Sequence, residues 1–257
     1  MAAQRDVERI CYVTMAPDLG TLAKQHIASG GMAVTLRPRA SGPIIDFHDD
    51  GRAVEVLPAF EVPTAIDGMA MYNVQNAMFA VAISQGLGQS FAQIRAGLKS
   101  LDCSHADTPG RLDFFDGFPF LVVLDYAHNP TEFSEVSAAL AQLDCSGRHI
   151  VAFTSPGNRT DRQIDDLAAT AAQSAYDHYI CFRRDELRRR GPSEVSERLH
   201  DGLLSSGVKA EQITVVSPEE DAVKAALDMA RPGDIVALLY TDHDHVWNLL
   251  TADQLPA

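Results

Sequence analysis

The residues most able to do chemistry in this sequence are Asp125, His128 and Asn129, which stand close together in the segment LVVLDYAHNP. The four apolar residues before Asp125 predict a buried strand, and the proline after Asn129 suits the first turn of a helix. In open α/β sheets, ligands bind outside the carboxyl ends of the strands. We therefore expect an acid, an imidazole and an amide at the edge of a sheet where such folds bind their ligands.

Each member of this cluster also has a structural interpretation. Asp125 is either a contact for a ribose hydroxyl or metal-bound water, or a capping acid, since aspartate is common near helix starts. His128 taken alone is more often a turn residue than a catalytic one. The spacing D-x-x-H-N-P between a strand and a helix favours a functional interpretation. One hypothesis is therefore a catalyst in which Asp125 and His128 form an acid/base pair.

Two further polar features precede this cluster. Arg111 follows a Pro-Gly turn and precedes a predicted strand over residues 112–115. A rigid turn that presents an arginine is suited to a phosphate or adenine contact, although a surface arginine is the alternative. Asn73 and Asn76 lie one turn apart at the start of a predicted Ala-rich helix, so we expect one to cap the helix and the other to contact a ligand.

Two later segments are rich in arginine. The loop SPGNRTD, residues 155–161, contains Asn158 and Arg159 between a predicted strand and helix, and its backbone amides suit an anion, or it is an ordinary capped loop. Five arginines fall within residues 183–190 (RRDELRRR). Such a run is either a solvated helix face or a site for a carboxylate or another anion.

Metal and disulfide chemistry have little support. The segment DHDH, residues 242–245, has the composition of a metal site, but residues two apart do not converge on a helix, and its first aspartate suits a helix cap. We expect no metal site there. The cysteines Cys11, Cys103, Cys145 and Cys181 form no C-x-x-C and no zinc-type spacing. They are predicted to be reduced, buried thiols in a reducing compartment.

Composition excludes several classes of protein. The formal net charge of −14 argues against a nucleic-acid binder, which needs a basic surface. No apolar run approaches the roughly 20 residues of a membrane span, and residues 1–12 lack the apolar core of a signal peptide. A cytoplasmic protein without nucleic-acid or membrane partners is the expectation.

The pattern of elements changes near residue 108. Before it, strands are predicted at 9–13, 32–37, 43–47 and 53–57, the last three as a meander, with helices at 20–29, 69–87 and 90–98. After it, apolar strands alternate with helices: strands at 120–125, 149–154, 178–182, 213–216 and 234–240, and helices at 131–143, 161–175, 193–204, 218–230 and 244–250. Alternation of this kind predicts an α/β fold with a Rossmann-like parallel sheet covered by helices on both faces. We expect domains at 1–108 and 109–257.

Together these motifs resemble the Mur ligase superfamily, whose members form amide bonds at the expense of ATP. The resemblance rests on three motifs in order along the chain: YNVQNA before an Ala-rich helix, then PGR, then DYAHNP. Further segments also match and stand in the family's order: CYVTM, SPGNRTDRQIDDLA, DHYICFRRDELRRRGPSEV, ARPGDIV and VWNLL. It runs from residue 9 to residue 250 and is greatest for the Mur-like half of the cyanophycin synthetases. Residues 1–108 would then be a truncated α/β remnant of the central ligase domain, and 109–257 the C-terminal domain.

The resemblance also implies roles for individual residues. ATP would be contacted, from the side opposite the family's P-loop, by Asn76, Arg111, Asp125, His128 and Asn129, with His128 also the catalytic candidate. The incoming amino acid would be recognised by Asp185, Arg188, Asn158 and Arg159. Relatives more often carry an acid at the position of Asn158.

The sequence departs from this family in one important respect. No G-x-x-x-x-G-K-[ST] occurs, and the ATP-grasp region and the acidic magnesium ligands of the family are not found. Separately from this resemblance, no G-x-G-x-x-G follows a strand, so the fingerprint of a nicotinamide-binding protein is missing. The cofactor expected is ATP; Mg²⁺ is expected in the family but its ligands are absent here. Without the P-loop lysine and metal ligands, γ-phosphate transfer should fail.

The function implied is the nucleotide- and amino-acid-binding portion of a cyanophycin-synthetase-like ligase, inactive alone. Such a ligase adds arginine to the β-carboxyl of a poly-aspartate backbone through an acyl phosphate. The expected partners are ATP, arginine, the aspartate-arginine polymer, and either further copies of the chain or a P-loop-bearing ligase half. The alternative is a non-catalytic binding or assembly protein that pairs with a full-length ligase or binds the polymer.

Overall fold

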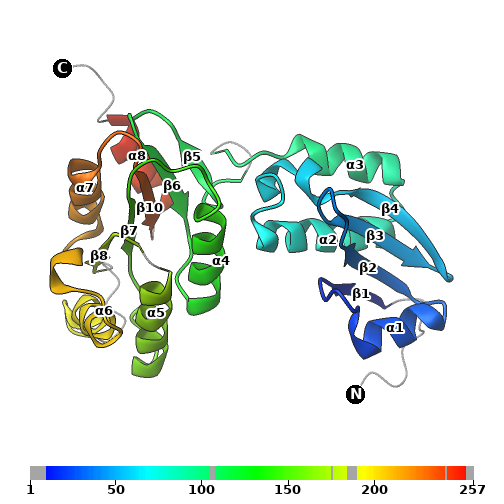
Figure 1. Cartoon of the computed structure of the whole chain (residues 1–257), viewed down its shortest axis with the longest axis horizontal. Coiled ribbons are helices and arrows are strands. Elements are labelled where there is room, and N and C mark those ends of the chain that lie inside the picture. The colour runs from blue at the N-terminus through cyan, green and yellow to red at the C-terminus, as the bar shows by residue number, and fades with distance from the viewer. Residues whose placement is uncertain (1–9, 105–107, 175, 184–189, 241, 253–257) are drawn as a thin grey trace. The chain divides into compact units, whose positions relative to one another are not determined.

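The computed structural model describes residues 10–104, 108–174, 176–183, 190–240 and 242–252 (Figure 1). The chain divides into two compact units, Met1–Asp102 and Cys103–Ala257. Each unit has a sheet and a hydrophobic core of its own, and the two are described separately.

The first unit is a four-stranded sheet with helices. Its strands, in the order β1-β2-β3-β4, are β1 (Cys11–Thr14), β2 (Met32–Arg37), β3 (Ile44–Asp49) and β4 (Arg52–Pro58). Its helices are α1 (Gly20–Ala28), α2 (Met71–Gly86) and α3 (Phe91–Ser100), with 3₁₀ turns η2 (Ala59–Glu61) and η3 (Pro63–Ala65). The expected meander is confirmed, because β2, β3 and β4 pair antiparallel, while β1 pairs parallel to β2.

The second unit carries a six-stranded sheet in the order β5-β6-β10-β7-β8-β9. Its strands are β5 (Asp113–Phe115), β6 (Leu121–Asp125), β7 (His149–Phe153), β8 (His178–Phe182), β9 (Ile213–Val216) and β10 (Ile235–Leu239). Its helices are α4 (Pro130–Leu140), α5 (Asp161–Gln173), α6 (Glu194–Ser205), α7 (Glu219–Met229) and α8 (His243–Ala252), with the 3₁₀ turn η4 (Ala210–Gln212). The predicted α/β fold with a Rossmann-like sheet is confirmed.

The order of the strands determines which helix covers which face. From β6 the chain steps past β10 to β7, β8 and β9 in one direction, so right-handed crossovers place α4, α5 and α6 on one face. The return from β9 to β10 runs the opposite way, and α7 and α8 lie on the other face (Figure 1). The chain therefore reverses its direction around β6, β10 and β7, and a crevice for ligands is expected at their carboxyl ends.

One strand departs from the expected parallel arrangement. β5 pairs antiparallel with β6, with Asp113 opposite Leu124. Only residues 116–120 connect the two strands, and so short a connection cannot return the chain for parallel pairing. As a result, the amino end of β5 lies beside the carboxyl end of β6.

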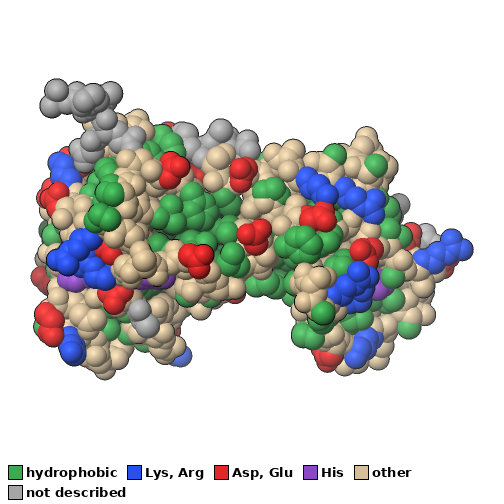
Figure 2. All heavy atoms as spheres, turned by 45° about the horizontal axis from the view of Figure 1, so that its top comes forward, with side chains coloured by type: hydrophobic (Ala, Val, Ile, Leu, Met, Phe, Trp, Pro, Cys, Tyr) green, Lys and Arg blue, Asp and Glu red, His purple; other side chains and the backbone are tan. Residues whose placement is uncertain are grey.

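Charged side chains of both signs lie on the surface of the protein. On the face drawn in Figure 2, acidic and basic side chains are interspersed with apolar ones, without a continuous basic stripe. No helix in the described part of the chain is long and apolar enough to cross a membrane.

At the amino ends of the strands, one buried aspartate holds several segments together. Asp234 accepts hydrogen bonds from the backbone N–H of Arg148 at 2.7 Å and of Arg231 at 2.9 Å. It also accepts one from Nη2 of Arg148 at 2.7 Å. Burial opposes ionisation of Asp234, but these hydrogen bonds hold the pKa of its carboxyl below the ordinary value.

We predict that Asp234→Asn destabilises the second unit by about 3 kcal/mol, because it leaves the Arg148 guanidinium without its anion. The depressed pKa of Asp234 contributes stability above its unfolded pKa, and that contribution is lost as pH falls through its folded pKa. Urea unfolding as a function of pH should therefore show a smaller acid-side loss for the variant. Equal stability of the two proteins at neutral pH would contradict the prediction.

Candidate functional site

Arg111 lies in a tight turn at the carboxyl edge of the sheet, and a buried aspartate holds the turn on each side. Gly110 and Leu112 have positive φ values of 80° and 52°. The N–H of Gly110 donates to Oδ2 of Asp113 at 2.9 Å, and the N–H of Leu112 donates to Oδ2 of Asp125 at 3.0 Å. The arginine is therefore presented by a backbone whose neighbouring amides are both bound to carboxylates.

Asp125 ends β6 and is almost fully enclosed, with 2% of its surface exposed. Its Oδ1 accepts a hydrogen bond from the N–H of Ala127 at 2.8 Å. Burial raises the pKa of Asp125 to about 6, opposed by the hydrogen bond from Leu112, the charge of Arg111 and the hydrogen bond from Ala127. The Asp125 carboxylate thus holds the backbone of Leu112, the residue that follows Arg111.

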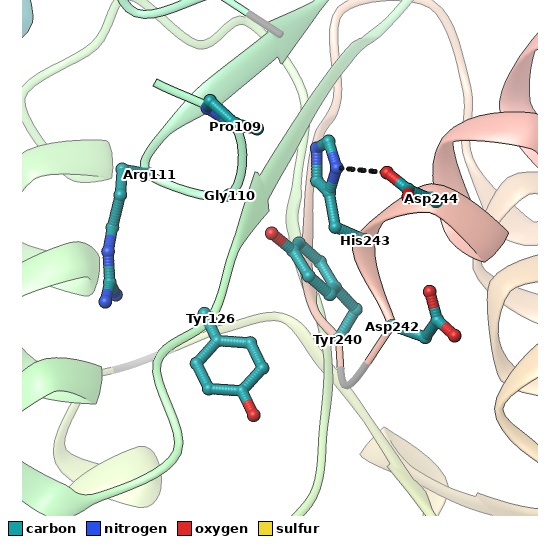
Figure 3. Close-up of a pocket in the computed structure, with 8 residues that line it drawn as sticks. All are labelled: Pro109, Gly110, Arg111, Tyr126, Tyr240, Asp242, His243 and Asp244. Carbon is teal, nitrogen blue, oxygen red and sulfur yellow. Dashed lines mark hydrogen bonds and ion pairs between the residues drawn. The ribbon is translucent and has the colours of Figure 1, made fainter. Parts of the chain in front are cut away.

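A hollow of about 370 Å³ lies beside this turn. Its lining residues are Pro109, Gly110, Arg111, Tyr126, Tyr240, Asp242, His243 and Asp244. Figure 3 shows the Tyr240 hydroxyl directed toward Gly110, with His243 next to it at the start of α8. Nε2 of His243 lies 2.7 Å from Oδ2 of the fully buried Asp113, so the last helix is tied to the turn that presents Arg111.

His128 lies further along the same edge, in the connection from β6 to α4. Its Nδ1 is 2.9 Å from the carbonyl of Tyr126, and its Nε2 is 3.3 Å from Nη2 of Arg159. Arg159 belongs to the loop that follows β7. Asn129 caps α4, because its Oδ1 accepts from the N–H of Glu132 at 3.0 Å. The candidates from three separate segments therefore meet at one edge.

The remaining candidates are more dispersed. Asn158 is exposed in the β7–α5 loop. Asn76 belongs to the first unit, is exposed on α2, and donates from Nδ2 to Oδ1 of Asn73 at 3.2 Å. The expectation that one of these asparagines caps the helix is wrong, since Ala70 is the N-cap and Asn73 instead donates to the carbonyl of Thr64 at 2.7 Å. Asp185 and Arg188 lie outside the described residues.

Sequence reasoning missed three residues that line or support the hollow, namely Asp113, Tyr240 and His243. A signal for two of them was present, because Asp113 follows the Pro-Gly-Arg turn by two residues and Tyr240 ends an apolar strand. The segment DHDH includes the expected cap, with the N–H of His245 donating to Oδ1 of Asp242 at 3.1 Å. Among the described residues, no group of three His, Cys, Asp or Glu side chains is placed to hold a metal ion.

The fold is that of known ligases. The chain is similar to the structure of E. coli FolC in complex with DHPP and ADP, with a TM-score of 0.64 and 20% identity over 95% of this chain and 54% of that one. It is also similar to a murein peptide ligase from Psychrobacter arcticus, with a TM-score of 0.60 and 17% identity over 96% and 52% of the two chains. These similarities establish the fold class.

The sequence establishes the family. Residues 110–239 match the Mur ligase, glutamate ligase domain, and the chain belongs to this family. It is 29% identical over 237 residues to the cyanophycin synthetase of Trichormus variabilis, covering 92% of this chain and 25% of that protein. It is 29% identical over 220 residues to the UDP-N-acetylmuramoyl-L-alanyl-D-glutamate–2,6-diaminopimelate ligase of Aquifex aeolicus, covering 83% and 42%. The chain thus spans about a quarter of the length of the cyanophycin synthetases that it matches.

We predict that Gly110→Ala destabilises the second unit by about 2 kcal/mol or more, because a Cβ there meets Tyr240 Oη and the φ of 80° disfavours alanine. Urea unfolding of Gly110→Ala combined with Tyr240→Phe should recover part of the loss. Gly97→Ala, within helix α3 and facing open space, is the control and should stabilise the chain. Equal effects of the two glycine substitutions would rule out this account.

The raised pKa of Asp125 gives a second prediction. Between its ordinary value of 3.8 and about 6, the folded state retains a proton that the unfolded state has released. By linkage, the contribution of this group to the free energy of unfolding falls as pH rises through that window. Wild type should therefore lose stability relative to Asp125→Asn from about pH 4 to pH 7 in urea titrations. Parallel curves for the two proteins would show that Asp125 titrates normally.

Proposed function

We propose that this chain supplies the nucleotide- and amino-acid-binding part of an ATP-dependent ligase similar to cyanophycin synthetase. The reaction would add arginine to the β-carboxyl of a poly-aspartate backbone through an acyl phosphate. The observation that carries this proposal is the arginine-bearing turn, held by two buried aspartates at the carboxyl edge of a Mur ligase domain. An exposed arginine presented by a backbone turn that is fixed in this way suits a nucleotide phosphate.

The ATP side of the proposed site is built around Arg111. Tyr126 and Tyr240 add aromatic surface to the same hollow. Asp125 holds the turn by accepting a hydrogen bond from the N–H of Leu112. His128 and Asn129 follow within four residues of Asp125, and we assign all of them to the nucleotide side. Asn76, from the first unit, is assigned to ATP by the family resemblance. The FolC structure with ADP, which shares the fold, supports a nucleotide in proteins of this class.

The amino-acid side is assigned to the loops that follow β7 and β8. These loops carry Asn158 and Arg159 in the first case and Asp185 and Arg188 in the second. Attack of an amine on an acyl phosphate needs a positioned amine and positive charge near the departing phosphate, more than a dedicated nucleophile. An arginine-rich edge meets that requirement.

Transfer of the γ-phosphate is assigned to a P-loop-bearing part of a ligase rather than to these residues. The 257 residues contain no G-x-x-x-x-G-K-[ST] motif. The described side chains also do not fit a magnesium site, since no three acidic or imidazole groups are placed together. These two observations also favour the second candidate function, a non-catalytic ligase-like protein that pairs with a complete ligase or binds the polymer.

We predict that the chain binds ATP and that Arg111→Ala weakens this binding about tenfold, because a hydrogen bond to a charged group contributes roughly 1.5–3 kcal/mol. Isothermal titration calorimetry with ATP measures the effect. Arg162→Ala is the matched control, since it removes the same charge from a side chain that is 91% exposed on α5. The proposed nucleotide site is wrong if wild type does not bind ATP or if the two variants bind it equally well.

A further inference from the structure

Asp113 lies where helix α8 meets the Arg111 turn, and only one of its two carboxylate oxygens has hydrogen-bond partners. Oδ2 accepts the N–H of Gly110 at 2.9 Å and lies 2.7 Å from Nε2 of His243. Oδ1 is buried and has no hydrogen-bond partner among the described residues. A buried polar group costs free energy unless its hydrogen bonds replace those lost to water. In the described part of the chain, that replacement comes from Gly110 and His243 alone.

His243 is the donor in its contact with Asp113. A carboxylate oxygen accepts hydrogen bonds, so Nε2 of His243 carries a proton. The neutral ring with its proton on Nε2 meets this requirement, and so does the doubly protonated ring. Nδ1 lies on the other side of the ring, 3.3 Å from Oδ1 of the exposed Asp244. The imidazole and the backbone of the turn therefore share one acceptor atom, Oδ2 of Asp113.

The ring of His243 is enclosed between the turn and α8. Its centroid lies 5.4 Å from that of Tyr240, and it stacks with Trp247 at 6.1 Å with an interplanar angle of 26°. A Cβ on Gly110 would lie 3.9 Å from Cδ2 of His243, so the ring also reaches the turn itself. Figure 3 shows His243 beside Tyr240 at the start of α8. Only 15% of the His243 side chain is exposed.

A second contact joins β5 to α8 beside the first. Phe115 lies two residues after Asp113 on the same face of β5, and Trp247 lies one turn after His243 on α8. The two rings meet edge to face, with centroids 5.3 Å apart and planes at 90°. The strand and the helix are thus joined by one polar pair and one apolar pair. Because the apolar pair is independent of the imidazole, a change at His243 should release Gly110 without detaching α8.

We propose that His243 is a positioning residue for Arg111: by holding Asp113, it fixes the N–H of Gly110 and with it the turn that presents the arginine. Without this donor the turn would adopt further conformations. A site that is competent in only a fraction of the molecules binds its ligand more weakly by that fraction. Only the identity of the ligand, a nucleotide, rests on the proposed function.

Three variants of the whole chain separate the hydrogen bond of His243 from the packing of its ring. His243→Phe keeps an aromatic ring between Tyr240 and Trp247 but removes the donor. His243→Gln returns an amide N–H at the same distance along the side chain as Nε2. His245→Phe is the matched control, because it makes the same substitution at an exposed position of the same helix.

Hydrogen exchange of the ¹⁵N-labelled chain without ligand, followed by NMR, tests whether His243 holds the turn. The amide of Val151 in β7 reports opening of the whole unit. His243→Phe should raise the exchange rate of Gly110 relative to that of Val151 at least tenfold, whereas His243→Gln and His245→Phe should change this ratio less than threefold. An unchanged ratio in His243→Phe overturns the proposal. Should that variant fail to fold, His243→Asn decides in the same way, since its amide is one carbon too short to reach Asp113.

Isothermal titration calorimetry with ATP tests the consequence for the ligand. His243→Phe should weaken binding at least threefold, and His243→Gln should restore it. Equal affinity of His243→Phe and wild type overturns the proposal, even where exchange of Gly110 is faster. If wild type does not bind ATP, the proposed function is wrong, and the exchange rates alone decide whether His243 holds the Arg111 turn.

Discussion

The hydrogen bond from the backbone of Leu112 to the carboxylate of Asp125 joins the edge strand β5 to the end of the first parallel strand. The antiparallel register that places Asp113 opposite Leu124 brings Leu112 opposite Asp125, where a side chain takes over from main-chain pairing. The geometry of the Arg111 turn follows from this contact. A hydrogen bond to a buried charged group contributes roughly 1.5–3 kcal/mol, which is comparable to the cost of the positive φ at Leu112.

The two parts of the candidate site are connected through the short segment that leaves β6. Tyr126 lines the hollow beside Arg111, and its carbonyl oxygen orients the imidazole of His128, which in turn contacts Arg159. A change beside Arg111 can therefore reach the loop after β7 through two residues, Tyr126 and His128. This proximity follows from the strand order, because the carboxyl ends of β6, β10 and β7 are neighbours in the sheet.

The sequence predicted most of the elements of the second unit, because continuous apolar strands separated by capped helices leave few alternatives. It also predicted that Asp125 and His128 lie where a strand ends and that Arg111 lies in a turn before the next strand. The antiparallel direction of β5 was not predicted, since pairing direction depends on the length of the connection. The contact of His243 with Asp113 joins residues 130 positions apart, and no local pattern reveals it. The cap expected at Asn73 or Asn76 failed because Ala70 is the N-cap of α2, so both asparagines lie inside the helix.

The position of β10 has a consequence for how the second unit is made. This strand comes after the other five in the chain, yet it lies between β6 and β7 in the sheet and pairs with both. During synthesis, the residues of β6 and β7 leave the ribosome before those of β10. The N–H and C=O groups that β6 and β7 direct toward β10 can pair only after residues 235–239 have been made. The sheet is therefore completed after most of the unit has been translated, and the nascent chain exposes two unpaired strand edges until then.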